Sequence, residues 1–455
     1  MSDDKDKIDR YFGSNKPGAE HAATPGAEEG RPPLVLGLRA KSRAPIFVPP
    51  HFESRHILLV GTTGSGKSQA IFNLLKTIRA RGEKALIMDH GGEILQRFYR
   101  PDVDHIFNPF DRRGVTWGPF SEAIRRYDWI KIAKFIIPNG EGETAHWNGR
   151  AQNFLANGMS QLSKRGEVFA TTEALLEFML RANLHGKDDE TSLQNIMLGT
   201  SSQPLFAPGA DRALSSVHGI VSDSLTAMEH LLLRERGQAG ERFSMGDWVK
   251  QEKDSWSYLS YTDASFAAIQ PLFSILIASA IQNVMELRPD ADRRFYFVLD
   301  ELASLGKVPH LVDALTKFRK YGGSVIAGIQ SISQLEELYG EKGAQTLLSC
   351  FNTKILLRTT DSATAEAESL LVGAELRAEQ NTSSTVQADG QESHGTSNSL
   401  NERRIIMPRT FMNLADLKGY ALVGGQPGVQ EIEIPYAGLD PVFVAEDTDP
   451  AIFNI

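Results

Sequence analysis

The sequence lacks the features that would direct it out of the cell or into a membrane. Its one cysteine, Cys350, excludes a disulfide framework and a cysteine-rich zinc module. No apolar stretch follows the charged residues 1–7, so a secretory signal is absent. No run approaches the roughly 20 apolar residues that a membrane helix needs. The nearest run, 272–284, carries serine, glutamine and asparagine side chains. The sequence therefore predicts a soluble, cytoplasmic chain.

An excess of basic residues is also missing. Lysine and arginine number 48 against 57 aspartate and glutamate residues, which gives a formal net charge of −9. This balance excludes a surface that is basic throughout and wraps nucleic acid. A local basic groove stays compatible with it, because net charge does not report how charges are distributed. The histidines show no metal-binding spacing such as H-E-x-x-H.

The chain does contain enough apolar material for several domains. It has 455 residues, of which 41% are hydrophobic, and a chain of this length has roughly two to four domains. Residues 1–32 are charged and rich in glycine, proline and alanine, a composition that predicts a disordered tail. Compact structure is therefore expected to begin near residue 33.

Short apolar runs without alternation predict strands that are buried on both faces of a parallel sheet. The run at 56–60 is followed by a helical pattern over 69–81 and by a second run at 84–89. Strand, helix and strand with short links indicate a right-handed crossover between parallel strands. Further strands are expected later in the chain, at 294–300, 323–330 and 353–358.

Strand-like runs vanish between residues 128 and 240, where helical periodicity dominates. We therefore expect an all-α domain that is inserted into the sheet domain. The insertion would split the nucleotide-binding domain into residues 33–127 and 241–455. In the second part, the polar residues 379–402 predict an exposed, mobile loop, and residues 419–434 resemble a terminal hairpin.

Residues 61–68 match the P-loop pattern G-x-x-x-x-G-K-[ST] at every fixed position. They lie between a predicted strand and a predicted helix, where backbone N–H groups and the helix N-terminus can hold phosphate. Lys67 should reach the β- and γ-phosphates of a nucleotide, and the Ser68 hydroxyl should ligate Mg²⁺. The expected nucleotide-binding residues are Gly61, Thr62, Thr63, Gly64, Ser65, Gly66, Lys67 and Ser68.

Two acids, Asp300 and Glu301, end a later apolar strand. A parallel sheet gathers its chemistry at the carboxyl ends of its strands, so both acids are expected near the nucleotide. Asp300 is predicted to hold Mg²⁺ together with Ser68, and Glu301 to polarise the attacking water. An adjacent glutamate is typical of hydrolytic motors rather than of small-molecule kinases, which need no activated water.

Two further candidates are Gln330 and Arg319. Gln330 ends the strand that follows Asp300, where a side-chain amide can hydrogen-bond both water and the γ-phosphate and so sense hydrolysis. Arg319 lies with Lys317 and Lys320 at the end of the intervening helix, where the helix dipole alone favours cations. An arginine there can also project into a neighbouring subunit and stabilise its transition state.

Other motifs leave alternatives open. Residues 89–93, Asp-His-Gly-Gly-Glu, follow a strand and either approach the nucleotide or form a turn. Paired cations such as Arg403-Arg404 either contact a phosphate backbone or are solvated surface. Trp147 either stacks on a base or belongs to the core.

Several segments together resemble the type IV coupling proteins of bacterial conjugation, the TraD/TrwB type. The similar segments lie around the acids, around Arg319 and Gln330, after the second strand and near the polar segment: 299–305, 313–317, 319–320, 327–331, 334–335, 108–111 and 397–404. The resemblance covers roughly residues 33 to 440. It implies an α/β fold, a RecA-like P-loop NTPase with a mainly parallel central sheet and an inserted all-α domain.

The resemblance also implies roles and partners. Lys67, Ser68, Asp300 and Glu301 fall on the family's nucleotide motifs, Gln330 on its γ-phosphate sensor and Arg319 on its trans-acting arginine. Such proteins form hexamers and hydrolyse ATP with Mg²⁺ in a reaction that DNA stimulates. They move single-stranded DNA through the pore of the hexamer. Their partners are the relaxase and other relaxosome proteins, together with the ATPases and inner-membrane components of a type IV secretion channel.

One departure and two alternatives remain. Family members typically begin with two membrane-spanning helices that anchor them in the inner membrane, and this sequence shows none. The first alternative is an ATP-gated platform that recruits relaxase and channel proteins, which would hydrolyse ATP slowly and ignore DNA. The second is a double-stranded DNA translocase similar to the FtsK/HerA motors, which would share the site and differ in its substrate.

Overall fold

The structure is a computed structural model that describes residues 31–448 except 124, 126, 187–188, 236–241, 253, 291 and 387–391. The expected disordered tail therefore lies, up to residue 30, outside the described residues. The chain divides into two compact units. Unit 1 comprises Met1–Thr77 and Ile326–Gly438, and unit 2 comprises Ile78–Val325 and Leu439–Ile455. The boundaries between the units lie inside one helix, after residue 77, and inside one strand, after residue 325.

The sheet of unit 1 combines a parallel centre with an antiparallel edge. Its strands occur in the order β2-β1-β13-β12-β9-β3-β8. β3 is parallel to both β8 and β9, whereas the other pairs are antiparallel. The expected terminal hairpin is confirmed as β12 and β13, while β1 and β2 had no clear sequence signal. The strands are β1 (Leu34–Arg39), β2 (Pro45–Val48), β3 (Ile57–Val60), β8 (Gly323–Ile329), β9 (Thr353–Leu356), β12 (Lys418–Leu422) and β13 (Val429–Glu433).

The helices of unit 1 follow its strands along the chain. The longest are α3, which begins at the P-loop lysine, and α14, which is interrupted at Gly340 by a non-helical backbone conformation. The bounds are α2 (Pro50–Glu53), α3 (Lys67–Ala80), α14 (Ile332–Cys350), α15 (Ser362–Val372) and α16 (Pro408–Met412).

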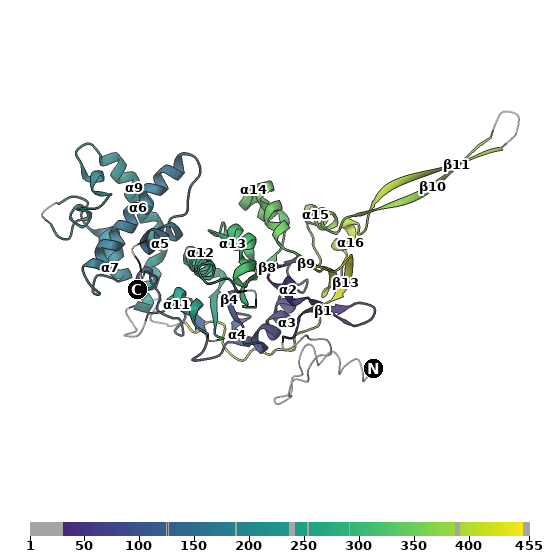
Figure 1. Cartoon of the computed structure of the whole chain (residues 1–455), viewed down its shortest axis with the longest axis horizontal. Helices are drawn as coiled ribbons and strands as arrows, with labels where there is room; N and C mark the ends of the chain where they lie inside the picture. Colours follow the sequence, from purple (N-terminus) through teal and green to yellow (C-terminus); the bar gives the residue numbers. More distant parts are fainter. Residues whose placement is uncertain are drawn as a thin grey trace. The chain divides into compact units, whose positions relative to one another are not determined.

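Residues 379–402, expected to form a loop, lie largely in a second, two-stranded sheet. β10 (Ala374–Val386) pairs with β11 (Glu392–Arg404) along its whole length in antiparallel register. Figure 1 shows this ribbon extending from the α15 and α16 region of unit 1. The polar composition wrongly predicted a loop, because backbone hydrogen bonds between two strands require no apolar side chains. The expectation of a loop is corrected accordingly.

The sheet of unit 2 is parallel throughout. Its strands occur in the order β7-β4-β6-β5, and each pair of neighbouring strands is parallel. Nearly all their residues are buried, which explains the continuous apolar runs in the sequence. The strands are β4 (Lys84–His90), β5 (His105–Ile106), β6 (Trp256–Tyr261) and β7 (Phe295–Leu299).

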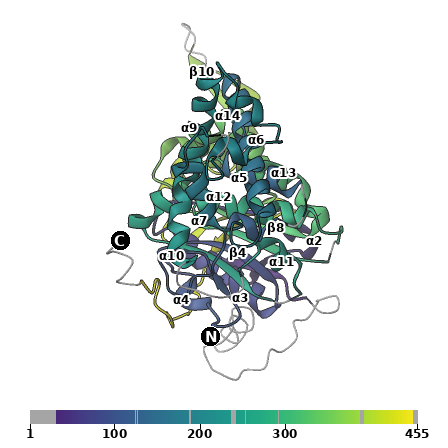
Figure 2. The same cartoon turned by 90° about the vertical axis from the view of Figure 1, so that its left-hand side faces the viewer.

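Helices replace strands in the described part of residues 128–235. The structure assigns these helices to the same unit as the parallel strands of unit 2. Figures 1 and 2 both show α6 and α9 side by side. The bounds are α5 (Asp128–Ile136), α6 (Glu143–Lys164), α7 (Thr172–Leu176), α8 (Leu193–Ile196), α9 (Asp211–Leu225), η4 (Thr226–Leu231) and α10 (Leu232–Glu235).

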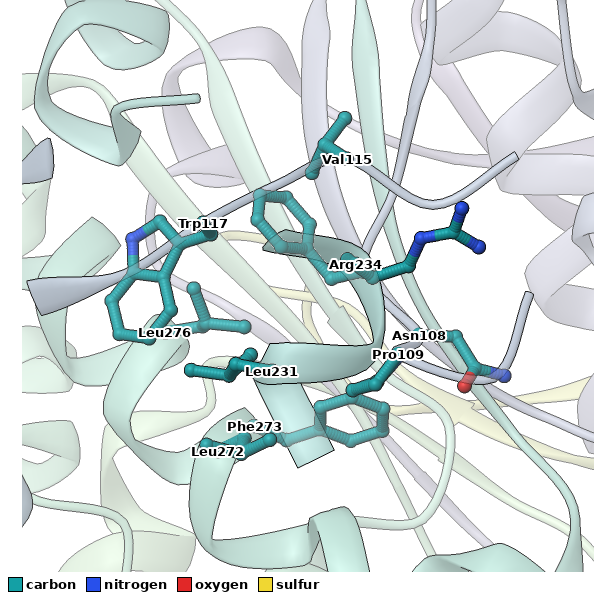
Figure 3. Close-up of a pocket in the computed structure, with 10 residues that line it drawn as sticks. Asn108, Pro109, Val115, Trp117, Leu231, Arg234, Leu272, Phe273 and Leu276 are labelled. Carbon is teal, nitrogen blue, oxygen red and sulfur yellow. The ribbon is translucent and has the colours of Figure 1, made fainter. Parts of the chain in front are cut away.

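The long helix α12 (Asp263–Met285) joins these helices to the strands of unit 2. It packs against α5, β6, α11 (Met245–Lys250) and α13 (Leu311–Lys317). Figure 3 shows Leu272 and Leu276 of α12 facing Leu231 and Trp117 around a small, mostly apolar cavity of about 20 Å³. Among the described residues, α12 alone is long and apolar enough to cross a membrane, but 56% of its most apolar stretch is buried. Core helices of globular proteins share these properties.

The buried side chain of Glu368 in α15 provides a test of the packing of unit 1. Glu368 has no exposed surface, and neither of its carboxyl oxygens has a hydrogen-bond partner among the described residues. Burial raises the pKa of Glu368 from 4.5 to about 9. Between these values the folded chain binds a proton that the unfolded chain releases, so stability falls as pH rises.

We predict that Glu368→Gln removes this decline. The wild-type free energy of unfolding should fall with a slope of up to about 1.4 kcal/mol per pH unit between pH 5 and 9, and the variant should show a flatter profile. Urea unfolding at a series of pH values measures both slopes. Equal slopes in the two proteins would contradict the burial of a protonated carboxyl.

Candidate nucleotide-binding site

The P-loop of unit 1 connects the buried strand β3 to the helix α3. All four residues of β3 are fully buried, and α3 begins at Lys67. Gly64 and Gly66 have φ angles of 78° and 114°. These backbone conformations are open to glycine and strained for other residues, which explains glycine in these two positions. The loop therefore turns sharply at the start of a helix, as phosphate binding requires.

Neighbouring segments of unit 1 hold the loop in this shape. The Gly61 N–H donates to the Ile329 carbonyl at 3.1 Å, and the Thr62 N–H donates to the Arg358 carbonyl at 2.9 Å. On the other side, the Leu417 N–H donates to the Ser65 carbonyl at 3.0 Å. Three segments that are distant in sequence thus fix the path of the loop backbone.

The polar side chains of the loop are arranged for a phosphate ligand. Lys67 is buried, and its ammonium group donates to the Gly61 carbonyl. The Ser65 hydroxyl is buried without a hydrogen-bond partner among the described residues. At Gly61, a Cβ atom would lie 2.6 Å from Ser65 Oγ and 2.9 Å from Leu357 Cβ, so only glycine fits. This cradle and its orphaned hydroxyl fit a nucleoside triphosphate.

Gln330 lies beside the P-loop in unit 1. β8 is parallel to β3, with Ile329 opposite Val60, so Gln330 follows its strand at the same level as Gly61. Sequence reasoning missed Arg358 on the other side of the loop. Its carbonyl also accepts a hydrogen bond from Thr62 Oγ1 at 3.2 Å, and its guanidinium lies 2.8 Å from Asp416. A predicted strand at 353–358 was the only signal for it.

In unit 2, Asp300 and Glu301 follow β7, as expected. Leu299 is opposite Met88 in the parallel pair of β7 and β4, so Asp89 lies at the same level as Asp300. Asp89 is buried, and its carboxylate accepts hydrogen bonds from the Ile94 and Leu95 N–H groups at 3.0 and 2.7 Å. Asp89 thus anchors a turn before α4 (Leu95–Phe98). Residues 89–93, for which the sequence left a turn and an approach to the nucleotide open, contribute to this turn.

The environment of these acids suits a bound cation. Burial, together with the negative charge of Asp300, raises the pKa of Asp89 from 3.8 to about 7, although the hydrogen bonds from Ile94 and Leu95 act in the opposite direction. The described residues contain no cluster of three histidine, cysteine or carboxylate side chains that could hold a metal ion alone. Mg²⁺ keeps several waters and usually combines one or two carboxylates with phosphate oxygens, so such a cluster is not required.

Arg319 is exposed on the short helix η6 (Phe318–Tyr321) that follows α13. Its two cationic neighbours are engaged within the unit. Lys317 forms an ion pair of 2.6 Å with Asp313, and Lys320 lies over the ring of Tyr321. Within the described residues, the Arg319 side chain forms no ion pair or hydrogen bond.

The predicted site residues thus form one group in each unit. Unit 1 brings Gln330 together with the P-loop residues 61–68, and unit 2 brings Asp300 and Glu301 together with Asp89. Trp147, which was open between a base-stacking and a core role, is half-buried and has Arg150 over its ring at 5.4 Å.

Comparison with known proteins identifies the family. A family model described as the type IV secretion-system coupling protein DNA-binding domain matches residues 41–435. The chain belongs to this family. The coupling protein TraD of Escherichia coli K12 is 26% identical over 410 residues, which are 88% of this chain and 56% of TraD. The chain thus spans little more than half the length of this relative.

Solved structures of the coupling protein TrwB have the same fold. The unbound monoclinic form of TrwBΔN70 is 29% identical, with a TM-score of 0.76 and 91% of each chain covered. TrwB in complex with ADP and Mg²⁺ is also 29% identical, with a TM-score of 0.74 over 90% of this chain and 91% of that one. The expected α/β fold of a RecA-like P-loop NTPase with inserted helices is confirmed.

Proposed function

We propose that this coupling-protein chain is a DNA-stimulated ATPase motor that transfers single-stranded DNA into a type IV secretion channel during conjugation. The observation that carries the proposal is the preformed P-loop between β3 and α3, in a fold shared with TrwB. TrwB has been solved with ADP and Mg²⁺, which supports ATP and Mg²⁺ as the ligands of this chain.

In the proposed site, the P-loop N–H groups hold the phosphates and Lys67 neutralises the β- and γ-phosphates. Ser68 and Asp300 complete the Mg²⁺ coordination, together with phosphate oxygens and water. Glu301 polarises the water that attacks the γ-phosphate. Gln330 reports whether the γ-phosphate is present, which its place beside Gly61 supports.

We further propose that Arg319 acts in a neighbouring copy of the chain. An exposed guanidinium that has no partner among the described residues can contact a triphosphate that another subunit binds. Catalysis then requires a homo-oligomer, and the family resemblance favours a hexamer.

The proposed partners follow from the family. They are single-stranded DNA, the relaxase and other relaxosome proteins, and the ATPases and inner-membrane components of a secretion channel. The proposed location is the cytoplasmic side of the inner membrane.

Steady-state ATP hydrolysis with and without single-stranded DNA tests the proposed function. We expect DNA to stimulate hydrolysis, and the specific activity to rise cooperatively with protein concentration as subunits assemble.

Lys67→Ala should nearly abolish turnover because it removes the phosphate-binding cation. Glu301→Gln should abolish turnover while ATP binding is retained, because only the activation of water is lost.

Each result separates the hypotheses. Slow hydrolysis that ignores DNA would favour the recruitment platform, and stimulation by duplex DNA alone would favour a double-stranded DNA translocase. Normal hydrolysis by Glu301→Gln would remove Glu301 from the role of base.

We predict that Arg319→Ala lowers the DNA-stimulated rate by about 10³-fold, the typical loss for an arginine that acts between subunits. Mixing it with a Glu301→Gln protein should restore part of the rate, because a mixed interface can pair one intact Glu301 with one intact Arg319. Lys320→Ala serves as the control, since this neighbouring cation lies over Tyr321 of its own chain. Full activity of Arg319→Ala would exclude the residue from the mechanism.

A further inference from the structure

The Gln330 side chain is not fixed by polar contacts of its own. It is half-buried, and it forms no hydrogen bond with another described residue. The direction of its amide therefore depends on the backbone on either side of it. Before Gln330, the strand β8 is fully buried and paired with β3. After Gln330, the chain enters α14 at once, with Ser331 as the N-cap of this helix.

Side chains in the first turn of α15 hold the start of α14. Figure 1 shows the two helices near one another in unit 1, and they are in contact. The Ser331 hydroxyl donates to Asp361 Oδ2 at 3.2 Å, and the Ile332 N–H donates to the Thr364 hydroxyl at 3.0 Å. The two residues that directly follow Gln330 are therefore both hydrogen-bonded to the start of α15.

Asp361 and Thr364 are themselves tightly connected. Asp361 is the N-cap of α15, and its carboxylate accepts hydrogen bonds from the N–H groups of Ala363 and Thr364 at 3.2 and 3.0 Å. The buried Thr364 hydroxyl donates its one proton to Asp361 Oδ2 at 2.6 Å, so its lone pairs are left to accept from Ile332. The Thr364 hydroxyl also holds the pKa of Asp361 below its usual value, which keeps the carboxylate ionised at neutral pH.

The same segment contacts the P-loop at its other end. Three residues before Asp361, the Arg358 carbonyl accepts hydrogen bonds from the Thr62 N–H at 2.9 Å and from the Thr62 hydroxyl at 3.2 Å. Between these contacts, the fully buried Thr359 accepts a hydrogen bond from the Asp361 N–H at 3.4 Å. Residues 358–364 thus join the P-loop to the start of α14, the two elements on either side of the proposed γ-phosphate.

We propose that Asp361 and Thr364 are positioning residues for the γ-phosphate sensor, which fix the two residues after Gln330 and so hold its amide toward the γ-phosphate at the P-loop. This inference rests on the proposed function, because it takes Gln330 as the sensor. Neither Asp361 nor Thr364 would contact the nucleotide.

The test is Thr364→Val, which keeps the shape of the side chain and removes the hydroxyl. Equilibrium affinities are measured with Mg²⁺ for ADP and for a non-hydrolysable ATP analogue. We expect the affinity for the analogue to fall about fivefold, because the hydrogen bond from Gln330 to the charged γ-phosphate is misaligned. The affinity for ADP should be unchanged, because ADP has no γ-phosphate. A general loss of structure would lower both affinities.

Two control variants carry single changes in the same helix. Thr364→Ser keeps a hydroxyl and should retain the wild-type preference for the analogue. Ser369→Ala removes another buried hydroxyl of α15, one that donates to the Ile406 carbonyl at 2.6 Å, and should leave both affinities unchanged.

A double variant tests whether Thr364 acts through Gln330. Gln330→Ala should lower the affinity for the analogue about tenfold, since it removes a hydrogen bond to a charged group. Adding Thr364→Val to Gln330→Ala should cause no further loss, because no amide is left to aim. These measurements need no turnover. Hydrogen exchange of the amides of residues 332–335 should also be faster in Thr364→Val than in wild type and in Ser369→Ala.

The outcomes are distinct. Unchanged exchange of residues 332–335 in Thr364→Val, or an equal loss of analogue affinity with and without the Gln330 amide, would overturn the positioning role. A wild-type preference for the analogue in Gln330→Ala would overturn the sensor role and this inference with it. The expected affinities in a wild-type chain that does not hydrolyse ATP would overturn the proposed motor and support the positioning role.

Discussion

The proposed nucleotide site of this chain depends on the parallel pairing of β3 with β8 and β9. The three strands end at one level, so the P-loop leaves β3 between the carbonyls of Ile329 and Arg358. Hydrogen bonds to these carbonyls use the first two N–H groups of the loop and define where it turns. The N–H groups at the start of α3 then point toward one small volume, which the helix dipole makes favourable for phosphate. A Cβ atom at Gly61 would obstruct this arrangement.

The acids of unit 2 are held by a different set of contacts. β7 positions Asp300 and Glu301 by its parallel pairing with β4. The turn after these acids borders a cavity, and two side chains of α12 donate hydrogen bonds to its backbone carbonyls. α12 also packs against α5 and η4 of the helical segment. One helix therefore contacts both the turn beside the proposed base and the helices at 128–235.

How far the sequence reveals this molecule differs from element to element. The strands β3, β4, β7 and β8 were predictable because continuous burial on both faces requires continuous apolar runs. The P-loop was predictable because phosphate binding fixes its residue types and their spacing. β10 and β11 were not, since their pairing satisfies backbone groups and leaves no apolar pattern. β1 and β2 likewise gave no pattern that could be separated from a loop.

The residues of the proposed site also differ in how far the sequence reveals them. Residues defined by their own chemistry, such as Lys67 and Asp300, are found by motif. Arg358 could not be found in this way, because its importance lies in a contact with a residue that is distant in sequence. Arg358 holds the loop through its carbonyl, a group that every residue has. Only the folded chain shows which carbonyl is used.

We propose that Ser68 of the P-loop and Asp300 after β7 serve one magnesium-bound triphosphate. The most direct test is the affinity for ATP as a function of free Mg²⁺, in wild type, Ser68→Ala, Asp300→Asn and the double variant. If one ion is shared, Mg²⁺ tightens ATP binding in wild type, each substitution weakens this dependence, and the double variant is no worse than the more affected single variant. The same magnesium dependence in Asp300→Asn as in wild type would contradict the claim.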